Sequence, residues 1–443
     1  MSARSTRRGF LRNAAGASVA AMGLPYFVKP SALGLAGAVA ASERIVCASI
    51  GVGPQGTGVM QNFLGQNDAQ VIAACDLKRD ARENAKKIID QRYGNMDCKL
   101  YTDFRELCAR ADVDVLSIAT CDHWHVLVAL EAARNGKDIY LEKPMGLSLK
   151  EDQSLRDVCR RCGTVFQFGT QQRSDNRFRF ACELALNERI GKLKQVNVWS
   201  PGSSPGGSNK IVPAPDWIDY DFWLGPAPYH PHTENRVSNA TWWFCSDYAL
   251  GFIAGWGVHP LDIALWGGGD KTLTGFEIEG KGVWPEPTGP HDTALNWDLT
   301  LKYDSGVVMR YTGDPRPQEW TQRYKNTDSH GTAFEGADGW VQVHRGAITA
   351  SSDELLKAEW GPNDIRLPHS GNHVRNLLDN VRTRGQTLCN IEAAVQADLL
   401  CQVSDIAIRM EQKLRWDAAA ERFVDNPTAN RRLVRAMRSP WRL

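Results

Sequence analysis

The chain has 443 residues, which is too long for one ordinary domain and indicates two domains with well-filled cores. Hydrophobic residues make up 42% of it and charged residues 23%, as in ordinary globular proteins. The formal net charge of +1 excludes the strongly basic surface with which proteins bind nucleic acid or anionic membranes.

The first 40 residues differ in composition from the rest. They contain five basic residues and no acidic residue, and an apolar stretch rich in Ala and Gly follows the basic cluster. Residues 6–12 (Thr-Arg-Arg-Gly-Phe-Leu-Arg) resemble the twin-arginine signal for the export of folded proteins, and Ala38-Val39-Ala40 resembles a cleavage site. We expect the twin-arginine export machinery to bind residues 1–40, which would place the protein in the periplasm. A basic, disordered arm is the alternative.

The cysteine and histidine patterns match no standard disulfide framework or metal site. There are 11 cysteines, an odd number without short regular spacing. Cys159 and Cys162 lie at helical spacing, so we favour ordinary helix positions over a metal or redox pair. The spacing of His230-Pro231-His232 and His291-Asp292 fits no standard zinc site, and we expect no bound metal.

From residue 44 onward, strand and helix patterns alternate with short turns. Strands are expected at residues 44–50, 70–75, 114–119, 138–141 and 164–168, with helices at 80–93 and 124–135. Repeated β-α-β units predict a parallel, doubly wound sheet of the α/β class in a domain of residues 44–170.

After about residue 190 the strands become longer and alternate more regularly. They are expected at 193–199, 275–283, 293–303 and 307–312, flanked by helices near 260–266 and 374–384. The pattern predicts an α+β domain over residues 171–443 with a mostly antiparallel, open sheet. A helix at 392–414 is expected to pack back on the first domain, and the last fifteen residues, with five arginines, to form a solvated tail. Residues 200–229, rich in Pro, Gly and Ser, are too long for a simple connection and predict a functional or interface loop.

A dinucleotide-binding pattern lies between the first strand and the next helix. In the sequence G-x-G-x-x-G, Gly51 would allow a tight turn, Gly53 would let the backbone approach a pyrophosphate, and Gly56 would allow close packing. Gln55 lies within the motif, at a helix N-terminus that stabilises negative charge. Asp76 ends the second strand, where an acid can bind the ribose hydroxyls.

Asp76 favours NAD over NADP, because a carboxylate repels a 2′-phosphate. Lys78 and Arg79 follow it and could reach such a phosphate, although the solvated first turn of a helix is the preferred interpretation. The expected cofactor is therefore NAD, with NADP left open.

Several motifs resemble those of one known family. Leu141-Glu142-Lys143-Pro144 resembles the Glu-Lys-Pro motif in the Rossmann domain of the Gfo/Idh/MocA oxidoreductases, which include glucose–fructose oxidoreductase and inositol dehydrogenase. Residues 119–125 resemble the family's loop beneath the nicotinamide, and residues 256–262 its catalytic helix. Further similarity lies at residues 169–173, 190–193 and 414–417, and the final Pro-Trp-Arg-Leu resembles exported members, so that the resemblance covers residues 44–443.

The resemblance implies roles for individual residues. Lys143 would orient the substrate hydroxyl and His259 would exchange its proton, as hydride transfer from an alcohol requires. The residues implied to contact the cofactor are Thr120, His125, Glu142 and Lys143. Those implied to contact the substrate are Arg173, Trp243, Trp256 and Asp262.

One position departs from the family pattern. An aspartate usually lies four residues before the catalytic histidine, and here that position is Gly255. Its loss removes an anchor for a polyol, while Asp262, one turn after His259, remains to orient the imidazole. Cys121 stands where proline is expected.

The expected function is hydride transfer between NAD(P) and a secondary hydroxyl or keto group of a sugar. Free NAD is scarce outside the cytoplasm, so the cofactor is expected to stay bound and to be recycled. Fifteen tryptophans suit a carbohydrate ligand, because sugar rings stack on aromatic faces. Two alternatives remain: redox-assisted cleavage of a glycoside, and a non-catalytic protein that binds a sugar or nucleotide. By analogy with the family, the protein is also expected to be a homo-oligomer.

Overall fold

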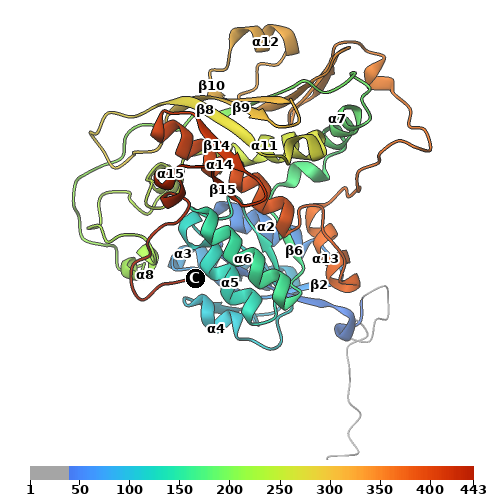
Figure 1. Cartoon of the computed structure of the whole chain (residues 1–443). Helices are drawn as coiled ribbons and strands as arrows, with labels where there is room; N and C mark the ends of the chain where they lie inside the picture. Colours follow the sequence, from blue (N-terminus) through green and yellow to red (C-terminus); the bar gives the residue numbers. More distant parts are fainter. Residues whose placement is uncertain (1–38) are drawn as a thin grey trace, which may run out of the picture. The chain divides into compact units, whose positions relative to one another are not determined.

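A computed structural model describes residues 39–443 of the chain (Figure 1). Residues 1–38, which carry almost all of the expected twin-arginine signal, lie outside the described part. A short 3-10 turn, η2 (Ala41–Glu43), precedes the first strand. None of the helices in the described part has both the length and the apolar character needed to span a membrane.

The first sheet has six parallel strands in the order β3-β2-β1-β4-β5-β6. They are β1 (Ile45–Ile50), β2 (Ala69–Cys75), β3 (Lys99–Tyr101), β4 (Val115–Ile118), β5 (Asp138–Leu141) and β6 (Phe166–Phe168). The expected doubly wound α/β domain is thereby confirmed. Ile50 lies opposite Cys75 and Ile118, so β1, β2 and β4 end at one edge of the sheet. The loops that follow these strands therefore meet at that edge, where ligands bind in doubly wound sheets.

Helices cover both faces of this sheet. On one face lie α2 (Pro54–Leu64) and α3 (Arg79–Tyr93), and on the other α4 (Phe104–Cys108), α5 (Asp122–Arg134) and α6 (Leu149–Cys162). The CxxC cysteines lie on α6, as expected, and Cys159 is buried there.

A helix from much later in the chain completes the first of these faces. We expected residues 374–384 to flank the antiparallel sheet, and this is wrong. In α13 (His373–Thr383), Val374 and Leu377 pack into the core of the first sheet. Arg375 forms an ion pair with Asp68 at 2.5 Å. The apolar face of the helix was evident from its sequence, but the sheet that it covers was not.

The second sheet has nine strands in the order β13-β12-β11-β7-β10-β9-β8-β14-β15. They are β7 (Gln195–Pro201), β8 (Phe276–Val283), β9 (Asn296–Tyr303), β10 (Val308–Asp314), β11 (Gly331–Glu335), β12 (Trp340–Val343), β13 (Ile348–Ala350), β14 (Leu414–Asp417) and β15 (Arg422–Phe423). Strands β7 and β10 pair in parallel and the other neighbours pair antiparallel, which confirms the expected mostly antiparallel sheet.

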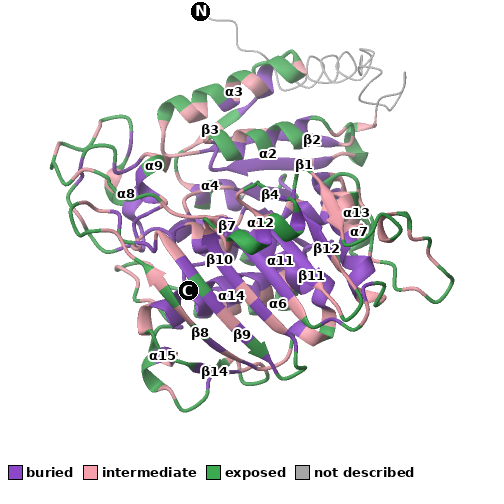
Figure 2. Ribbon diagram, turned by 90° about the horizontal axis from the view of Figure 1, so that it is seen from above, coloured by how far each residue is buried: buried purple, intermediate pink, exposed green. Residues whose placement is uncertain are grey.

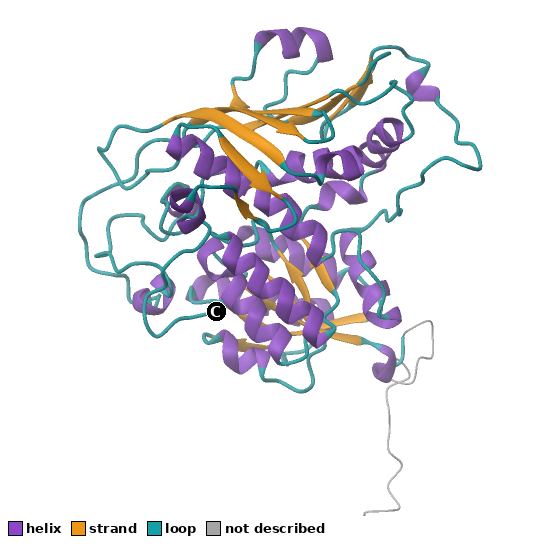
Figure 3. Ribbon diagram, viewed as in Figure 1, coloured by secondary structure: helices purple, strands orange, loops and turns teal. Residues whose placement is uncertain are grey.

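One face of the second sheet is covered by α7 (Asn176–Leu186), α11 (Val258–Gly268) and α14 (Ile391–Met410), and α12 (Gln318–Tyr324) lies on the other (Figure 3). The expected helix at 392–414 ends earlier, and the following residues form β14, which pairs with β8. The remaining helices are α8 (Tyr220–Leu224), α9 (Asn239–Trp242), α10 (Phe252–Gly255) and α15 (Pro427–Arg431), with 3-10 turns η3 (Gln171–Ser174), η4 (Gly269–Thr272) and η5 (Leu355–Lys357).

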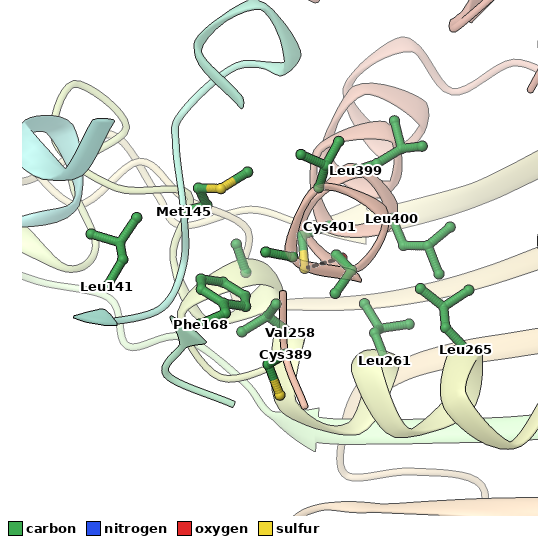
Figure 4. Close-up of a cluster of buried hydrophobic side chains, with 14 of the residues drawn as sticks. Leu141, Met145, Phe168, Val258, Leu261, Leu265, Cys389, Leu399, Leu400 and Cys401 are labelled. Carbon is green, nitrogen blue, oxygen red and sulfur yellow. Dashed lines mark hydrogen bonds between the residues drawn. The ribbon is translucent and has the colours of Figure 1, made fainter. Parts of the chain in front are cut away.

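A continuous hydrophobic core joins the two sheets (Figure 2). Figure 4 shows Met145 and Phe168 of the first domain in one cluster with Val258 and Leu261 on α11 and Leu400 on α14, with Phe168 beside Val258. Helix α14 also packs against α6 of the first domain, as expected. Burial of this much apolar surface stabilises one arrangement of the two sheets. The loops that lie between the sheets are therefore held in fixed positions.

The C-terminal segment is not the solvated tail that we expected. Arg438 donates to the carbonyl oxygen of Gly225 at 3.0 Å and forms an ion pair with Asp221 at 2.6 Å. The ring of Trp441 packs edge-on against Trp124, with the centroids 4.7 Å apart. The five arginines indicated solvation, but this segment lies against α5 and α8.

Candidate functional site

The glycine motif forms a tight loop between β1 and α2. Gly51 has a φ of +77°, and a Cβ there would lie 2.4 Å from the carbonyl oxygen of Ala119. A Cβ at Gly56 would lie 1.9 Å from the Gly51 oxygen, whereas a Cβ at Gly53 would meet nothing within 4 Å. The loop therefore leaves its backbone open at Gly53, beside the N-terminus of α2, where a pyrophosphate fits.

Asp76 lies beside this loop at the end of β2. Its carboxylate accepts hydrogen bonds from the backbone nitrogens of Val52 at 2.8 Å and Lys78 at 2.9 Å. Burial raises the pKa of Asp76. The ammonium of Lys78 donates to the carbonyl oxygen of Val237 at 2.9 Å, and the residue also lines the nucleotide cavity. The Asp76 carboxylate would repel a 2′-phosphate bound beside it, which supports NAD.

A cavity of about 300 Å³ lies along the glycine loop. The expected cofactor residues that line it are Gly51, Gly53, Gln55, Gly56, Asp76, Thr120, His125, Glu142 and Lys143. The structure therefore brings the whole expected set together around one volume. Its glycine loop, helix N-terminus and acidic side chain suit the pyrophosphate and ribose of NAD.

The facing wall of this cavity consists of aromatic residues from the second half of the chain. Phe222 and Trp223 come from α8, and Trp242 and Trp243 from α9 and the residue after it. The long segment 200–229 was expected to be a functional or interface loop. It contributes part of the wall of the nucleotide cavity.

The buried carboxylate of Glu142 organises the region before Lys143. Its Oε1 accepts from Gln55 Nε2 at 3.0 Å and from Gln171 Nε2 at 2.9 Å. The hydroxyl of Tyr140 donates to the same oxygen at 3.3 Å. A carboxylate with several donors holds its neighbours in one arrangement, and this fixes the backbone that carries Lys143.

His125 joins two loops beneath the cavity. Its Nδ1 lies 2.6 Å from the carbonyl oxygen of Pro144, and its Nε2 lies 3.1 Å from that of Thr120. Burial lowers the pKa of His125 to about 4, so the ring is neutral at neutral pH and donates to one of the two carbonyls. The histidine thereby holds the turn after Lys143 in place.

Lys143 lies where the nucleotide cavity meets a second cavity. Its ammonium donates to the carbonyl oxygen of Gly255 at 3.0 Å. The second cavity, of about 350 Å³, is lined by Lys143, Gly255, Trp243, Trp256 and His259 among others. The two cavities share six lining residues: Pro54, Gln55, Asp122, Lys143, Asn239 and Trp243. A ligand in the second cavity therefore lies next to a nucleotide in the first.

His259 is buried in the wall of the second cavity. Its pKa lies well below the usual value, because burial disfavours the charged ring and Lys143 and Arg345 repel it. Its Nδ1 has no hydrogen-bond partner within residues 39–443. The ring of Trp256 packs edge-on against it, with the centroids 5.5 Å apart. The neutral imidazole can accept a proton from a hydroxyl group in this cavity.

Two expected substrate residues lie elsewhere. Arg173 and Asp262 form a buried ion pair with each other, at 2.5 and 2.8 Å, and neither lines the two cavities. Asp262 does not hydrogen-bond to His259 in this arrangement. The pair joins η3 to α11 and so supports the helix that carries the histidine.

Sequence reasoning missed Asp122, Gln171, Asn239 and Arg345, which all line the second cavity. Asp122 lies inside the motif at residues 119–125, and burial raises its pKa well above the usual value. Its position at the start of α5, next to the nicotinamide loop, was a signal that could have identified it. No local motif marks Arg345, which lies between β12 and β13.

The chain matches two family models. Residues 45–170 match the model described as the NAD-binding Rossmann fold of the oxidoreductase family, and residues 199–443 match its C-terminal alpha/beta domain. The structure is similar to GenD2 from gentamicin A biosynthesis, solved with NAD, at a TM-score of 0.62 and 16% identity, covering 85% of this chain and 97% of that one. It is also similar to the WlbA dehydrogenase of Bordetella pertussis, solved with NADH and UDP-GlcNAcA, at a TM-score of 0.59 and 15% identity, covering 84% and 98%.

Curated relatives match only in part. A glycosyl hydrolase family 109 protein of Saccharopolyspora erythraea is 34% identical over 122 residues, which is 27% of this chain and 26% of that protein. A 2,7-anhydro-N-acetylneuraminate hydratase of Mediterraneibacter gnavus is 28% identical over 150 residues, which is 33% of this chain and 38% of that protein. The chain thus spans less than two fifths of the length of these relatives. The matches to both domain models, together with the fold, show that the chain belongs to the Gfo/Idh/MocA oxidoreductase family.

Proposed function

We propose that the protein transfers hydride between bound NAD and a secondary hydroxyl or keto group of a sugar or sugar derivative. The observation that carries this proposal is the position of Lys143, which lines both the nucleotide cavity and the adjoining cavity with His259. When bound, NAD supplies the hydride acceptor or donor. The chain supplies the groups that hold the substrate and move its proton.

Lys143 orients the hydroxyl group. Its ammonium is held by the carbonyl oxygen of Gly255 and still has further donors, so it can donate to a substrate oxygen at the junction of the cavities. Trp243 and Trp256 supply apolar walls of the second cavity, which suit the face of a sugar ring and exclude water.

His259 accepts the hydroxyl proton as the C–H bond is oxidised. Its ring is neutral at neutral pH, because burial and the two nearby cations lower its pKa. The same low pKa favours return of the proton in the reverse direction, when a keto group is reduced.

The similar proteins support a carbohydrate ligand. The WlbA structure contains a sugar nucleotide, and the Mediterraneibacter gnavus relative is named for a sugar derivative. A second candidate is redox-assisted cleavage of a glycoside, which the similarity to glycosyl hydrolase family 109 proteins favours. Release of nitrophenol from nitrophenyl glycosides, without net reduction of nicotinamide, would distinguish it.

Residues 1–40 are proposed to direct export through the twin-arginine machinery after the cofactor has bound. The proposal rests on the sequence of residues 6–12 and on the small residues at 38–40. Replacing Arg7 and Arg8 together by Lys should retain the protein in the cytoplasm, as fractionation with an antibody would show. A homo-oligomer also stays a prediction, which light scattering would test.

The deciding experiment is mass analysis of the nucleotide released from the purified protein, followed by absorbance spectra with a panel of sugars. Bound NAD, and a change in the reduced-nicotinamide band with a sugar, are expected. Absence of nucleotide and of NAD binding would contradict the proposal. So would bound NAD without any spectral change over the panel, and in that case the non-catalytic alternative would hold.

A further inference from the structure

Arg345 is a cation of the second cavity to which the proposed mechanism assigns no contact with the substrate. Its guanidinium stacks over the ring of Trp256, 4.7 Å from the centroid. No carboxylate within residues 39–443 forms an ion pair with it, and its side chain is exposed to the cavity. Many other arginines in that part of the chain, such as Arg173, have a carboxylate partner. A guanidinium that stacks on an aromatic ring and has no carboxylate partner can still bind an anion.

The turn that carries Arg345 is held in place on both sides. It joins β12 to β13, and the backbone nitrogen of Arg345 donates to His330 Nε2 at 3.4 Å. Next to it, the ring of His344 lies within hydrogen-bonding distance of the Asp328 carboxylate. Arg177 donates to the carbonyl oxygen of Gly346 at 2.9 Å. The position of the guanidinium is therefore prepared before any ligand binds, which lowers the entropic cost of binding.

Basic side chains outnumber acidic ones in the lining of the second cavity. Among the residues that line it, the cations are Lys143 and Arg345, and the carboxylate is Asp122, whose charged form is disfavoured by burial. The buried carboxylate of Glu142, outside this lining, also interacts electrostatically with Arg345. At Gly255, where related dehydrogenases have an aspartate, a Cβ would meet only Phe252 Cδ1, at 3.8 Å. There is thus room for a carboxylate at this position, but the chain has none.

We propose that the substrate carries an anionic group, a carboxylate or a phosphate, which Arg345 binds while the sugar ring lies beside Trp256. The planar guanidinium donates two parallel hydrogen bonds to such a group. Gly255 adds no carboxylate that would repel the anion. This inference rests on the proposed function for the chemistry that follows binding, but the binding itself is independent of hydride transfer.

The test compares acidic and neutral sugars of the same ring. Binding of glucuronate and glucose, and of galacturonate and galactose, is measured by titration calorimetry on the purified protein with its nucleotide, with glucose 6-phosphate as the phosphate probe. The acidic member is expected to bind about 10- to 100-fold more tightly than the neutral one, as for a hydrogen bond to a charged group. A preference for the uronates or for the phosphate identifies the anion.

The variant Arg345→Gln should remove this preference, because it should weaken the binding of the acidic sugars far more than that of the neutral sugars. Arg345→Lys should keep part of it, because the charge remains and the planar fork is lost. Arg366→Gln is the matched control: Arg366 also stacks on a tryptophan, 5.0 Å from the centroid of Trp360, but it does not line the cavity. This variant should keep the full preference.

Equal affinity for acidic and neutral sugars, equal weakening of both by Arg345→Gln, or no binding by any probe would overturn the inference. Nicotinamide absorbance is recorded in the same samples. Binding of the acid that depends on Arg345, without nicotinamide reduction, would sustain this inference and contradict the proposed function. Reduction of nicotinamide by a neutral sugar, together with equal affinity for that sugar and its acidic counterpart, would sustain the proposed function and contradict this inference.

Discussion

The ammonium of Lys143 donates to the carbonyl oxygen of Gly255 at 3.0 Å, and this bond joins the first domain to the short helix α10. Lys143 follows β5 of the parallel sheet, whereas Gly255 lies more than a hundred residues later in the chain. The contact positions the lysine at the junction of the two cavities. It also places residue 255 next to the reacting groups, so that substitutions there act on substrate binding.

Replacement of Lys143 by Met should reduce hydride transfer by about 10²- to 10⁴-fold, the range for loss of one acid–base or orienting group. NAD should still bind, because the glycine loop and Asp76 are unchanged. Reduction of nicotinamide measures the first effect, and NAD titration the second. Lys150→Met, at an exposed position on α6, is the control. If the Lys143→Met variant reduces nicotinamide at the wild-type rate, Lys143 has no role in hydride transfer.

Gly255→Asp should weaken the binding of acidic sugars about tenfold or more, because the new carboxylate repels an anion and attracts Lys143 and Arg345. Neutral sugars should be affected less. Asn is nearly isosteric with Asp but uncharged, so the variant Gly255→Asn separates the effect of side-chain size from that of charge. If the Asp and Asn variants give the same change in calorimetric affinity, charge at this position is unimportant.

Asp76→Asn should narrow the preference for NAD over NADP by about 10- to 100-fold, because it removes the charge that repels a 2′-phosphate. Lys78→Gln should change the preference little, since the Lys78 ammonium already donates to Val237. Titration with both nucleotides gives the two dissociation constants. A larger effect of Lys78→Gln than of Asp76→Asn would mean that Lys78 contacts the 2′-phosphate of NADP.

Asp262→Ala should lower the free energy of unfolding by about 3–5 kcal/mol, because it leaves Arg173 buried without its partner. Urea unfolding measures this effect. In contrast, the KM for sugar should stay near the wild-type value in the folded variant, because neither residue lines the cavity. A large rise in KM with unchanged stability would restore the direct substrate role that the sequence implied.

Stability should fall as the pH decreases below about 6.5, where histidines of the unfolded chain begin to bind protons. Burial lowers the pKa of His373 to about 4 in the folded protein, so only the unfolded state gains that proton between these values. Each such histidine contributes a slope of about 1.4 kcal/mol per pH unit. His373→Gln should reduce the slope by that amount in urea titrations from about pH 6 to 4.5. If the free energy of unfolding falls with the same slope in His373→Gln and in the wild type, the contribution assigned to His373 is contradicted.

The sequence by itself determined the parts of the molecule that depend on local geometry. The glycine loop needs a positive φ at Gly51 and no side chain at Gly56, and only glycine meets both demands. Asp76 follows its strand directly, and Lys143 follows another, so the parallel order of the sheet brings them to one edge. Hydrophobic periodicity likewise predicted both sheets, because it records which side of an element is buried.

Only the tertiary structure decided which distant segments meet. Periodicity shows that α13 has an apolar face, but not that the face covers the first sheet. The family resemblance implied substrate roles for Arg173 and Asp262, yet the two form an ion pair with each other. The arginines of the C-terminal segment indicated solvation, yet Arg438 forms an ion pair with Asp221. Arg345 lies in a turn without a motif, and only the packing of β12 and β13 against α7 brings it to the cavity with Lys143. Long-range contacts of this kind depend on the whole arrangement of packed elements, which no short stretch of sequence specifies.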